Sequence, residues 1–350
     1  MLNILIYTQC FAPKLGGIES VMTNIAIQSK KIGHDVNVLA DGSKSQSLSF
    51  DNQQNFEIKR FDQIKFFRNK IKSSFANDLL KNKQFDLVFF DSWKSIEHFT
   101  NTSKIKKICL IHGNEILNLK KKDRIVNALS KSDKILFNSK YTQTLFYKQL
   151  PELKHLQCQI IFPAFIQHTH HSNNEKKYDL CTIARLEYRK GHHLVLEALK
   201  KLKNEKNIIL TYAILGDGPE LSKLKDLVIK NNLLNQVDFI NNTNSSDIYK
   251  ISKIHVMPTI TTPDSIEGFG ISNVEAASFG LPSIVSSSGG TPESIDQNGY
   301  VINEHDINGL SEKILLSLEN YSKLSEKSLE FARNFENERK IREYLNCFAN

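Results

Sequence analysis

The start of the chain alternates apolar strand segments with an amphipathic helix, and this alternation restricts the fold more than any other feature. Residues 2–7 (LNILIY) form an apolar run typical of a buried strand. A glycine turn at 16–17 follows, and apolar side chains then recur at helical spacing over residues 18–31. A second strand is expected at residues 35–40. Strand, helix and strand in this order predict a βαβ unit and therefore a parallel sheet.

The alternation continues in two series separated by polar segments. Residues 42–55 are expected to be a loop, and residues 167–177 are expected to link two domains. Because 350 residues exceed the usual size of one core, we predict two doubly wound α/β domains that face each other across a cleft. Further strands are expected at 56–60, 86–90, 107–111, 134–138 and 159–162, and then at 179–184, 208–215, 237–240, 254–257, 281–285 and 300–302. Further helices are expected from about 140, at 191–202, at 220–230 and over the last forty residues.

The stretch 265–290 (SIEGFGISNVEAASFGLPSIVSSSGG) predicts a loop, a helix and a strand. Gly268 and Gly270 flank Phe269, so the backbone there can come close to a ligand. The helical pattern begins at Ile271 and ends at a glycine. A helix N-terminus behind a glycine loop is typical of an anion site, because its free N–H groups and the helix dipole favour phosphate.

Two glutamates lie on either side of this predicted anion site. Glu267 lies in the loop, and Glu275 lies about two turns into the helix. A ligand with a phosphate in the middle and hydroxyl groups at both ends fits this arrangement, and a nucleotide-sugar is such a ligand.

The stretch resembles the E-x7-E signature of retaining glycosyltransferases of family 4, which have the GT-B fold. The resemblance implies that Glu275 binds the ribose hydroxyls, that Glu267 approaches the donor sugar, and that the backbone from Gly268 through Phe269 and Gly270 to Ile271 holds the phosphates. It also implies a domain organisation. Residues 1–166 would form an acceptor-side Rossmann-like domain with residues 337–350 packed back on it, and residues 167–336 would bind the nucleotide-sugar.

The segment 184–191 (ARLEYRKG) resembles the R-x4-K-G phosphate site of the same family. Arg185 leaves the end of a predicted strand and Lys190 precedes the next helix, which is where doubly wound domains bind ligands. Both cations can neutralise a diphosphate. Glu187 and Arg189 are expected to be solvated.

Three further segments resemble parts of the family's site. The turn 215–219 (LGDGP) resembles its nucleotide-contact turn, with Gly216 as the close backbone contact and Asp217 as a turn residue. The loop GGIE, with Gly16 and Gly17, resembles the loop that faces the donor phosphates and the acceptor. His112 follows a predicted strand, at a place where the family often has a histidine that bonds the donor sugar.

The sequence contains no D-x-D motif, so we expect no metal and no other cofactor. The resemblance then implies that Arg185, Lys190 and loop amides stabilise the charge on the departing nucleoside diphosphate. Double displacement requires two close carboxylates. We find no partner for Glu267 and expect it to position the sugar.

The C-terminal segment carries large apolar side chains among charged residues, so it must pack against something. Two helical pieces are predicted with a break near 334–338. In GT-B enzymes the last helix packs on the first domain, and this resemblance places four side chains there: Ile341, Tyr344, Leu345 and Phe348.

The net charge of +8 is concentrated in the first half of the chain, in the clusters 65–72, 104–107 and 120–124. An anionic membrane leaflet would attract such clusters, although a lysine-rich composition explains them equally well. No apolar run is long enough to span a bilayer. The five scattered cysteines favour a reducing compartment. We expect a cytoplasmic protein, with possible peripheral contact at the inner face of the membrane.

The resemblance implies a retaining glycosyltransferase that uses a UDP- or GDP-sugar donor and a glycan or lipid-linked acceptor. It further suggests synthesis of capsule, O-antigen or lipopolysaccharide. Two alternatives remain open at this point. One is a GT-B nucleotide-sugar 2-epimerase, and the other is a basic protein that binds membrane or nucleic acid without catalysis. No nucleic-acid motif is visible, and we expect no nucleic-acid partner.

Overall fold

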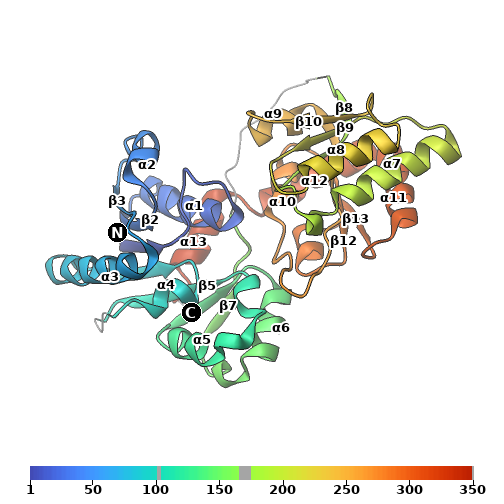
Figure 1. The fold of residues 1–350 in the computed structure, drawn as a ribbon. Helices are drawn as coiled ribbons and strands as arrows, with labels where there is room; N and C mark the ends of the chain where they lie inside the picture. Colours follow the sequence, from blue (N-terminus) through green and yellow to red (C-terminus); the bar gives the residue numbers. More distant parts are fainter. Residues whose placement is uncertain (101–103, 165–174, 349–350) are drawn as a thin grey trace. The chain divides into compact units, whose positions relative to one another are not determined.

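The computed structural model describes residues 1–100, 104–164 and 175–348, and these divide into two compact units (Figure 1). Unit 1 comprises Met1–Ile166 and Glu336–Asn350, and unit 2 comprises Gln167–Phe335. Most of the expected linker at 167–177 lies outside the described residues. Within the described residues, no helix is long and apolar enough to cross a membrane.

Unit 1 is built on a seven-stranded parallel sheet with the order β3-β2-β1-β4-β5-β6-β7. The central strand β1 pairs on both sides, with Ile4 opposite Val36 of β2 and Leu87 of β4. The strands are β1 (Asn3–Thr8), β2 (Asp35–Asp41), β3 (Glu57–Phe61), β4 (Leu87–Phe90), β5 (Lys106–Ile111), β6 (Lys134–Phe137) and β7 (Cys158–Ile160).

Helices cover both faces of this sheet, because successive side chains of a strand point to opposite faces. Val88 and Phe90 of β4 join a buried cluster that includes Trp93 and Ile125. Phe89, between them, packs edge-on against Tyr344 on the other face. The helices of unit 1 are α1 (Gly17–Lys31), α2 (Lys44–Asp51), α3 (Lys65–Asn82), α4 (Trp93–Glu97), α5 (Lys122–Leu129), α6 (Lys140–Gln149) and α13 (Asn337–Leu345), with 3-10 turns η1 (Asn114–Ile116), η2 (Leu119–Lys121) and η3 (Pro151–Leu153).

One expectation for unit 1 was wrong. Residues 42–55 are not a loop, since α2 lies within them and is capped by the Ser43 hydroxyl. This helix buries only Ser47 and therefore shows no apolar periodicity. The basic cluster 65–72 includes one buried lysine. Lys72 is buried in α3, and its Nζ donates to the Thr8 carbonyl at 2.5 Å and to Asp41 at 2.9 Å.

Unit 2 contains a six-stranded parallel sheet with the order β10-β9-β8-β11-β12-β13. The strands are β8 (Tyr178–Ile183), β9 (Tyr212–Leu215), β10 (Val237–Ile240), β11 (Ser252–Met257), β12 (Ser283–Ser286) and β13 (Gly299–Ile302). Leu180 and Cys181 of the central strand β8 enter two different buried clusters, so this sheet is also covered on both faces. The predicted architecture of two parallel α/β sheets is thus confirmed.

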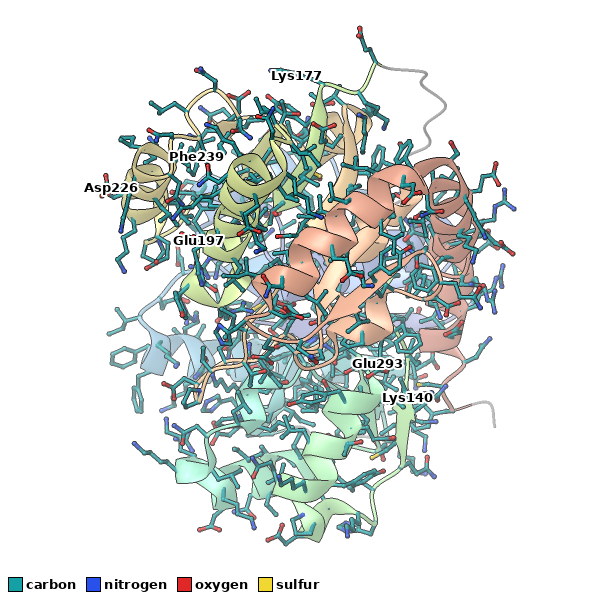
Figure 2. All side chains as sticks on the ribbon, turned by 90° about the vertical axis from the view of Figure 1, so that its right-hand side faces the viewer. Lys140, Lys177, Glu197, Asp226, Phe239 and Glu293 are labelled. Atoms are coloured by element: carbon teal, nitrogen blue, oxygen red, sulfur yellow. The ribbon has the colours of Figure 1, made fainter. Side chains whose placement is uncertain are left out.

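The helices of unit 2 pack on the two faces of its sheet. α7 and α8 supply much of one cluster. Phe239 of the edge strand β10 is labelled in Figure 2, and the Lys225 ammonium of α8 lies 6.0 Å from its ring centre. Ile248 of α9 and Ala276 of α10 belong to the other cluster. The helices are α7 (His192–Lys206), α8 (Leu221–Lys230), α9 (Ser245–Lys250), α10 (Ile271–Ser278), α11 (Ile307–Glu319) and α12 (Tyr321–Arg333), with 3-10 turns η4 (Tyr188–Lys190) and η5 (Thr291–Ser294).

The final helix α13 belongs to unit 1. Ile341, Tyr344 and Leu345 are buried there, and the helix lies against α1. The Asn24 side-chain amide donates to Asn337 at 2.8 Å. The ring of Phe348, just past the helix, has the Lys106 and Lys134 ammonium groups 5.4 and 5.6 Å from its centre.

We predict that Ile341→Ala will destabilise unit 1 by roughly 2–5 kcal/mol, because Ile341 is fully buried and its truncation leaves a cavity. Leu329→Ala is the control, since Leu329 is 43% exposed on α12. Denaturant unfolding measures both. A loss no larger than that of the control would show that α13 contributes little to the core of unit 1.

Candidate active site

The loop that carries Glu267 joins β11 to α10 and crosses the loop that follows β12. The amide of Gly290 donates to the Glu267 carbonyl at 2.8 Å. Gly289 has φ +57°, and a Cβ atom there would overlap the same carbonyl oxygen. Only glycine fits such a close approach at positive φ. The glycine pair after β12 thus fixes the backbone of Glu267.

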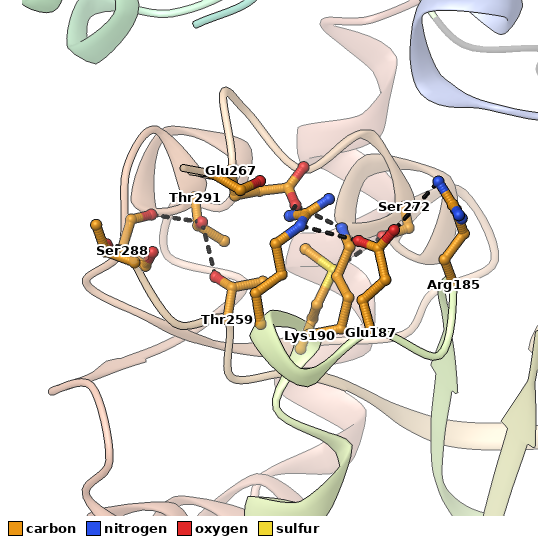
Figure 3. Close-up of polar contacts among 12 residues, drawn as sticks. Arg185, Glu187, Lys190, Thr259, Glu267, Ser272, Ser288 and Thr291 are labelled. Atoms are coloured by element: carbon orange, nitrogen blue, oxygen red, sulfur yellow. Dashed lines mark hydrogen bonds and ion pairs between the residues drawn. The ribbon is translucent and has the colours of Figure 1, made fainter. Parts of the chain in front are cut away.

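The Glu267 carboxylate is paired with two cations from the turn after β8. Lys190 Nζ lies 2.5 Å and Arg189 Nη1 lies 3.0 Å from the same oxygen, Oε2 (Figure 3). Burial opposes ionisation of this carboxyl group, but the charges of Lys190 and Arg189 outweigh it and hold the pKa of Glu267 below its ordinary value. Glu267 is therefore a carboxylate at neutral pH.

Further ion pairs extend this contact to Arg185. Arg189 Nε donates to Glu187 Oε2 at 3.0 Å, and Arg185 Nη1 lies 3.1 Å from Glu187 Oε1. The expectation that Glu187 and Arg189 are solvated was wrong, because both side chains are largely buried and paired. Arg185 differs, since its side chain is 73% exposed and open to a ligand.

Backbone bonds place the turn that carries these cations. Lys190 ends η4 directly before α7, and Gly191 follows at φ +72°, where a Cβ atom would overlap the Pro258 carbonyl. The amide of Ile260 donates to the Arg189 carbonyl at 2.7 Å. The turn after β8 is thereby tied to the segment after β11, the neighbouring strand of the sheet.

The LGDGP turn supports Arg185 from the side of β9. Gly216 has φ +153°, and a Cβ atom there would overlap the Ala184 carbonyl. The Leu186 amide donates to the Asp217 carbonyl at 2.9 Å. Asp217 is the turn residue that the sequence predicts, since its Oδ1 accepts from the Gly218 amide at 2.8 Å. The predicted contact of Gly216 with a nucleotide stays a prediction.

Glu275 on α10 has surroundings opposite to those of Glu267. It is only partly exposed, and in the described part of the chain no side chain or amide donates to its carboxylate. Burial alone raises its pKa to about 7. A partly buried carboxyl group without a partner can accept hydrogen bonds from hydroxyl groups of a ligand.

Between the two glutamates lies the N-terminus of α10. Gly270 is its N-cap at φ +94°, and no side chain caps the helix there. The Phe269 side chain is buried, with its ring centre 6.0 Å from that of Phe335. At Phe269 only the backbone can meet a ligand. The contacts predicted for Gly268, Phe269, Gly270 and Ile271 are compatible with this geometry and stay predictions.

A group of buried hydroxyls under these loops was not found from the sequence. Thr259 Oγ1 lies 3.2 Å from both Ser286 Oγ and Thr291 Oγ1, and Thr291 Oγ1 donates to the Ser288 carbonyl at 2.6 Å (Figure 3). Small hydroxyl residues in the run SSSGGT were the only available signal. These bonds hold the loop after β12 against the segment after β11.

The remaining predicted residues lie in unit 1. Gly17 begins α1, and the Glu19 side chain folds back over Gly16. His112 follows β5, and its Nε2 lies 3.1 Å from the Asp91 carbonyl after β4. The Asp91 carboxylate accepts from the Gln9 amide after β1 at 2.9 Å. The ends of three adjacent strands are therefore linked within unit 1, while the predicted contacts of Gly16, Gly17 and His112 with a donor stay predictions.

The pKa of Glu275 leads to a prediction about stability and pH. Its pKa is about 7 in the folded chain and near 4.5 when unfolded, so the folded state binds the proton more tightly. Wild-type stability should fall as pH rises through this range, whereas a glutamine does not titrate. Glu275→Gln should gain stability relative to wild type from pH 4.5 to 7 in urea unfolding.

Glu267→Gln is the control of opposite sign for this experiment. Since the folded pKa of Glu267 is lowered, its carboxylate stabilises the wild type above about pH 4.5, and the variant should be less stable there. A pH-independent difference between Glu275→Gln and wild type would contradict the assigned pKa of Glu275.

Comparison with known proteins places this geometry in context. Residues 165–337 match the model of the family described as glycosyl transferases group 1. An uncharacterized glycosyltransferase of Methanocaldococcus jannaschii is 23% identical, and the match covers 93% of this chain and 92% of that protein.

Solved structures share the fold over nearly the whole chain. HepE of Anabaena in complex with UDP gives a TM-score of 0.80 at 17% identity, covering 99% of this chain and 100% of that one. A glycosyltransferase of Rickettsia africae gives 0.79 at 18% identity, covering 99% and 98%. Sucrose-phosphate synthase of Thermosynechococcus elongatus gives 0.80 at 14%, covering 99% of each. The match to glycosyl transferases group 1 thus covers residues 165–337, while the solved structures share the fold of nearly the whole chain, which is GT-B.

Proposed function

We propose that the chain is a retaining glycosyltransferase, which moves a hexose or N-acetylhexosamine from a UDP- or GDP-sugar to a hydroxyl of a glycan or lipid-linked acceptor. The observation that carries the proposal is the pair of glutamates in opposite environments on either side of the N-terminus of α10. Glu267 is ionised and paired, and Glu275 is unpartnered in the described structure. The family match and the UDP bound to HepE support the same donor class.

The proposed chemistry assigns one task to each group. Arg185 and Lys190 stabilise the negative charge that develops on the departing diphosphate, together with the amides at Gly268–Ile271 and at Gly16 and Gly17. Glu275 holds the ribose, while Glu267 and His112 orient the donor sugar. No protein nucleophile is proposed: the acceptor oxygen bonds to the anomeric carbon on the face from which the diphosphate leaves, and the departing phosphate takes the proton of the acceptor hydroxyl.

The direct test is turnover of UDP- and GDP-sugars with and without acceptor glycans, preceded by a thermal-shift screen. A donor at 100 times its Kd should add about 2.7 kcal/mol of stability. Epimerisation of the donor without an acceptor would favour a 2-epimerase, and absence of any binding would favour a non-catalytic basic protein. We propose that the reaction needs no metal, so activity should persist in EDTA.

Kinetics should separate the roles of the two groups. Arg185→Ala and Lys190→Ala are each expected to lower kcat roughly a hundredfold, because they remove a charge that acts in the transition state. Glu275→Ala should mainly raise KM for the donor, since the ribose does not change during transfer. Full activity of either cation variant, or an unchanged KM in Glu275→Ala with a large fall in kcat, would contradict these roles.

We further propose that unit 1 touches an anionic membrane through the start of α3, as expected for an enzyme of cell-envelope polysaccharide synthesis at the inner face of the membrane. Ile64, Phe66 and Phe67 are 72, 79 and 54% exposed there, beside exposed Lys65 and Lys70. Aromatic and basic side chains together suit a bilayer interface.

Vesicle sedimentation tests this contact. The wild type should bind vesicles that contain phosphatidylglycerol more than phosphatidylcholine vesicles, and Phe66→Ser with Phe67→Ser should reduce this binding several-fold. Ile229→Ser, on an exposed residue of α8, is the control. Equal vesicle binding by all three proteins would contradict the proposed contact of α3 with the membrane.

A further inference from the structure

Two cations contact one oxygen of Glu267, although one charge would neutralise it. Lys190 Nζ and Arg189 Nη1 lie 2.5 and 3.0 Å from Oε2. Within residues 175–348 and the other described ranges, no donor lies within hydrogen-bond distance of Oε1. One cation is therefore surplus in this arrangement, and Oε1 is left for another group.

The two cations differ in how firmly they are held. The Arg189 guanidinium is fixed at both ends, by Glu267 on Nη1 and by Glu187 on Nε, and the Arg189 carbonyl accepts from the Ile260 amide. A planar guanidinium held in this way has little freedom to turn. The Lys190 ammonium is a compact charge on a flexible stem, and its contact with Glu267 is a single point.

We propose that Arg189 is the permanent counter-ion of Glu267, that Glu187 holds it in place, and that Lys190 is shared between Glu267 and an incoming diphosphate. The last part rests on the function proposed above. When Lys190 turns to the phosphate, Arg189 keeps Glu267 ionised, with Oε1 free to accept from a sugar hydroxyl. Arg189 and Glu187 are then positioning residues, which act through Glu267 and Lys190.

Glu275 shows within the same chain how the pKa of a carboxyl group behaves without a counter-ion. Glu275 is eight positions further along and has no cation beside it in the described structure, and burial raises its pKa to about 7. Glu267 has side-chain exposure of only 16%. Without Arg189, departure of Lys190 would leave Glu267 in the condition of Glu275. A protonated Glu267 would place a hydroxyl where the proposed sugar contact needs an acceptor.

The test is a pH titration of the Glu267 carboxyl carbon by 13C NMR in the ligand-free protein, with the signal assigned through its loss in Glu267→Gln. In Lys190→Met the pKa of Glu267 should stay below the neutral range, because Arg189 remains. In the double variant with Arg189→Met it should rise toward that of Glu275. If Lys190→Met alone raises it as far as the double variant, Arg189 is not the counter-ion.

Three variants refine the assignment. Glu187→Gln removes one of the two ion pairs that hold the Arg189 guanidinium. In the Lys190→Met background it should raise the pKa of Glu267 to a value between those of Lys190→Met and the double variant. Arg189→Lys in that background restores charge without the two-point hold and should also give an intermediate value. Arg342→Met removes an exposed pair with Glu338 on α13 and should leave the titration unchanged. No change of the Glu267 pKa in Glu187→Gln would exclude the holding role of Glu187.

Titration with UDP by calorimetry tests the shared cation separately. Lys190→Met should weaken UDP binding by about tenfold or more, which is the usual effect of losing a charged hydrogen bond. Arg189→Met should weaken it less than about threefold. Equal losses of UDP affinity in the two variants would make Arg189 a phosphate ligand and overturn the proposed division of roles between Arg189 and Lys190. If wild type binds neither UDP nor GDP, the proposed function fails, whereas the ligand-free titration still decides the counter-ion.

Discussion

The geometry of the site in unit 2 depends on the contact between Glu267 and its two cations. Glu267 comes from the loop after β11, and Arg189 and Lys190 come from the turn after β8, almost eighty positions earlier. Largely buried charges are costly unless each is paired, and breaking such a pair leaves an uncompensated charge. The alternation of sign from Arg185 through Glu187 and Arg189 to Glu267 and Lys190 meets this condition.

Much of the fold could be predicted because α/β units leave a strong sequence signal. β10 was placed to the residue, since a short strand pattern between asparagine-rich turns is typical of these units. The helices α2 and α3 were missed for the opposite reason. α2 buries one serine and shows no apolar stripe. In α3 the apolar side chains that pack on the core, Phe75, Leu79 and Leu80, are only partly buried, and the exposed Phe66 and Phe67 obscure the pattern.

Only some residues of the candidate site could be predicted from the sequence, for a similar physical reason. Glu267 and Lys190 each precede a glycine and Arg185 follows a strand end, and this context singles them out. Glu275 was found through its spacing from Glu267 on the predicted helix. Arg189 and Glu187 carry no local signal, because their partners depend on how two loops meet in space. A charged residue in a polar turn is usually solvated. Only the crossing of Glu267 over the glycine pair after β12 brings its carboxylate to Arg189.

The charge balance of the site also bears on why the pKa of Glu267 is lowered and that of Glu275 is raised. The ion-pair network holds three cations and two carboxylates, so it carries one positive charge in excess. The diphosphate of the proposed donor would carry more negative charge than this, and the uncapped N-terminus of α10 could compensate for part of the rest. In such a complex a fully ionised Glu275 on the same helix would oppose the phosphate. Its pKa of about 7 would keep it partly protonated until hydroxyl donors of the proposed ribose favour the carboxylate.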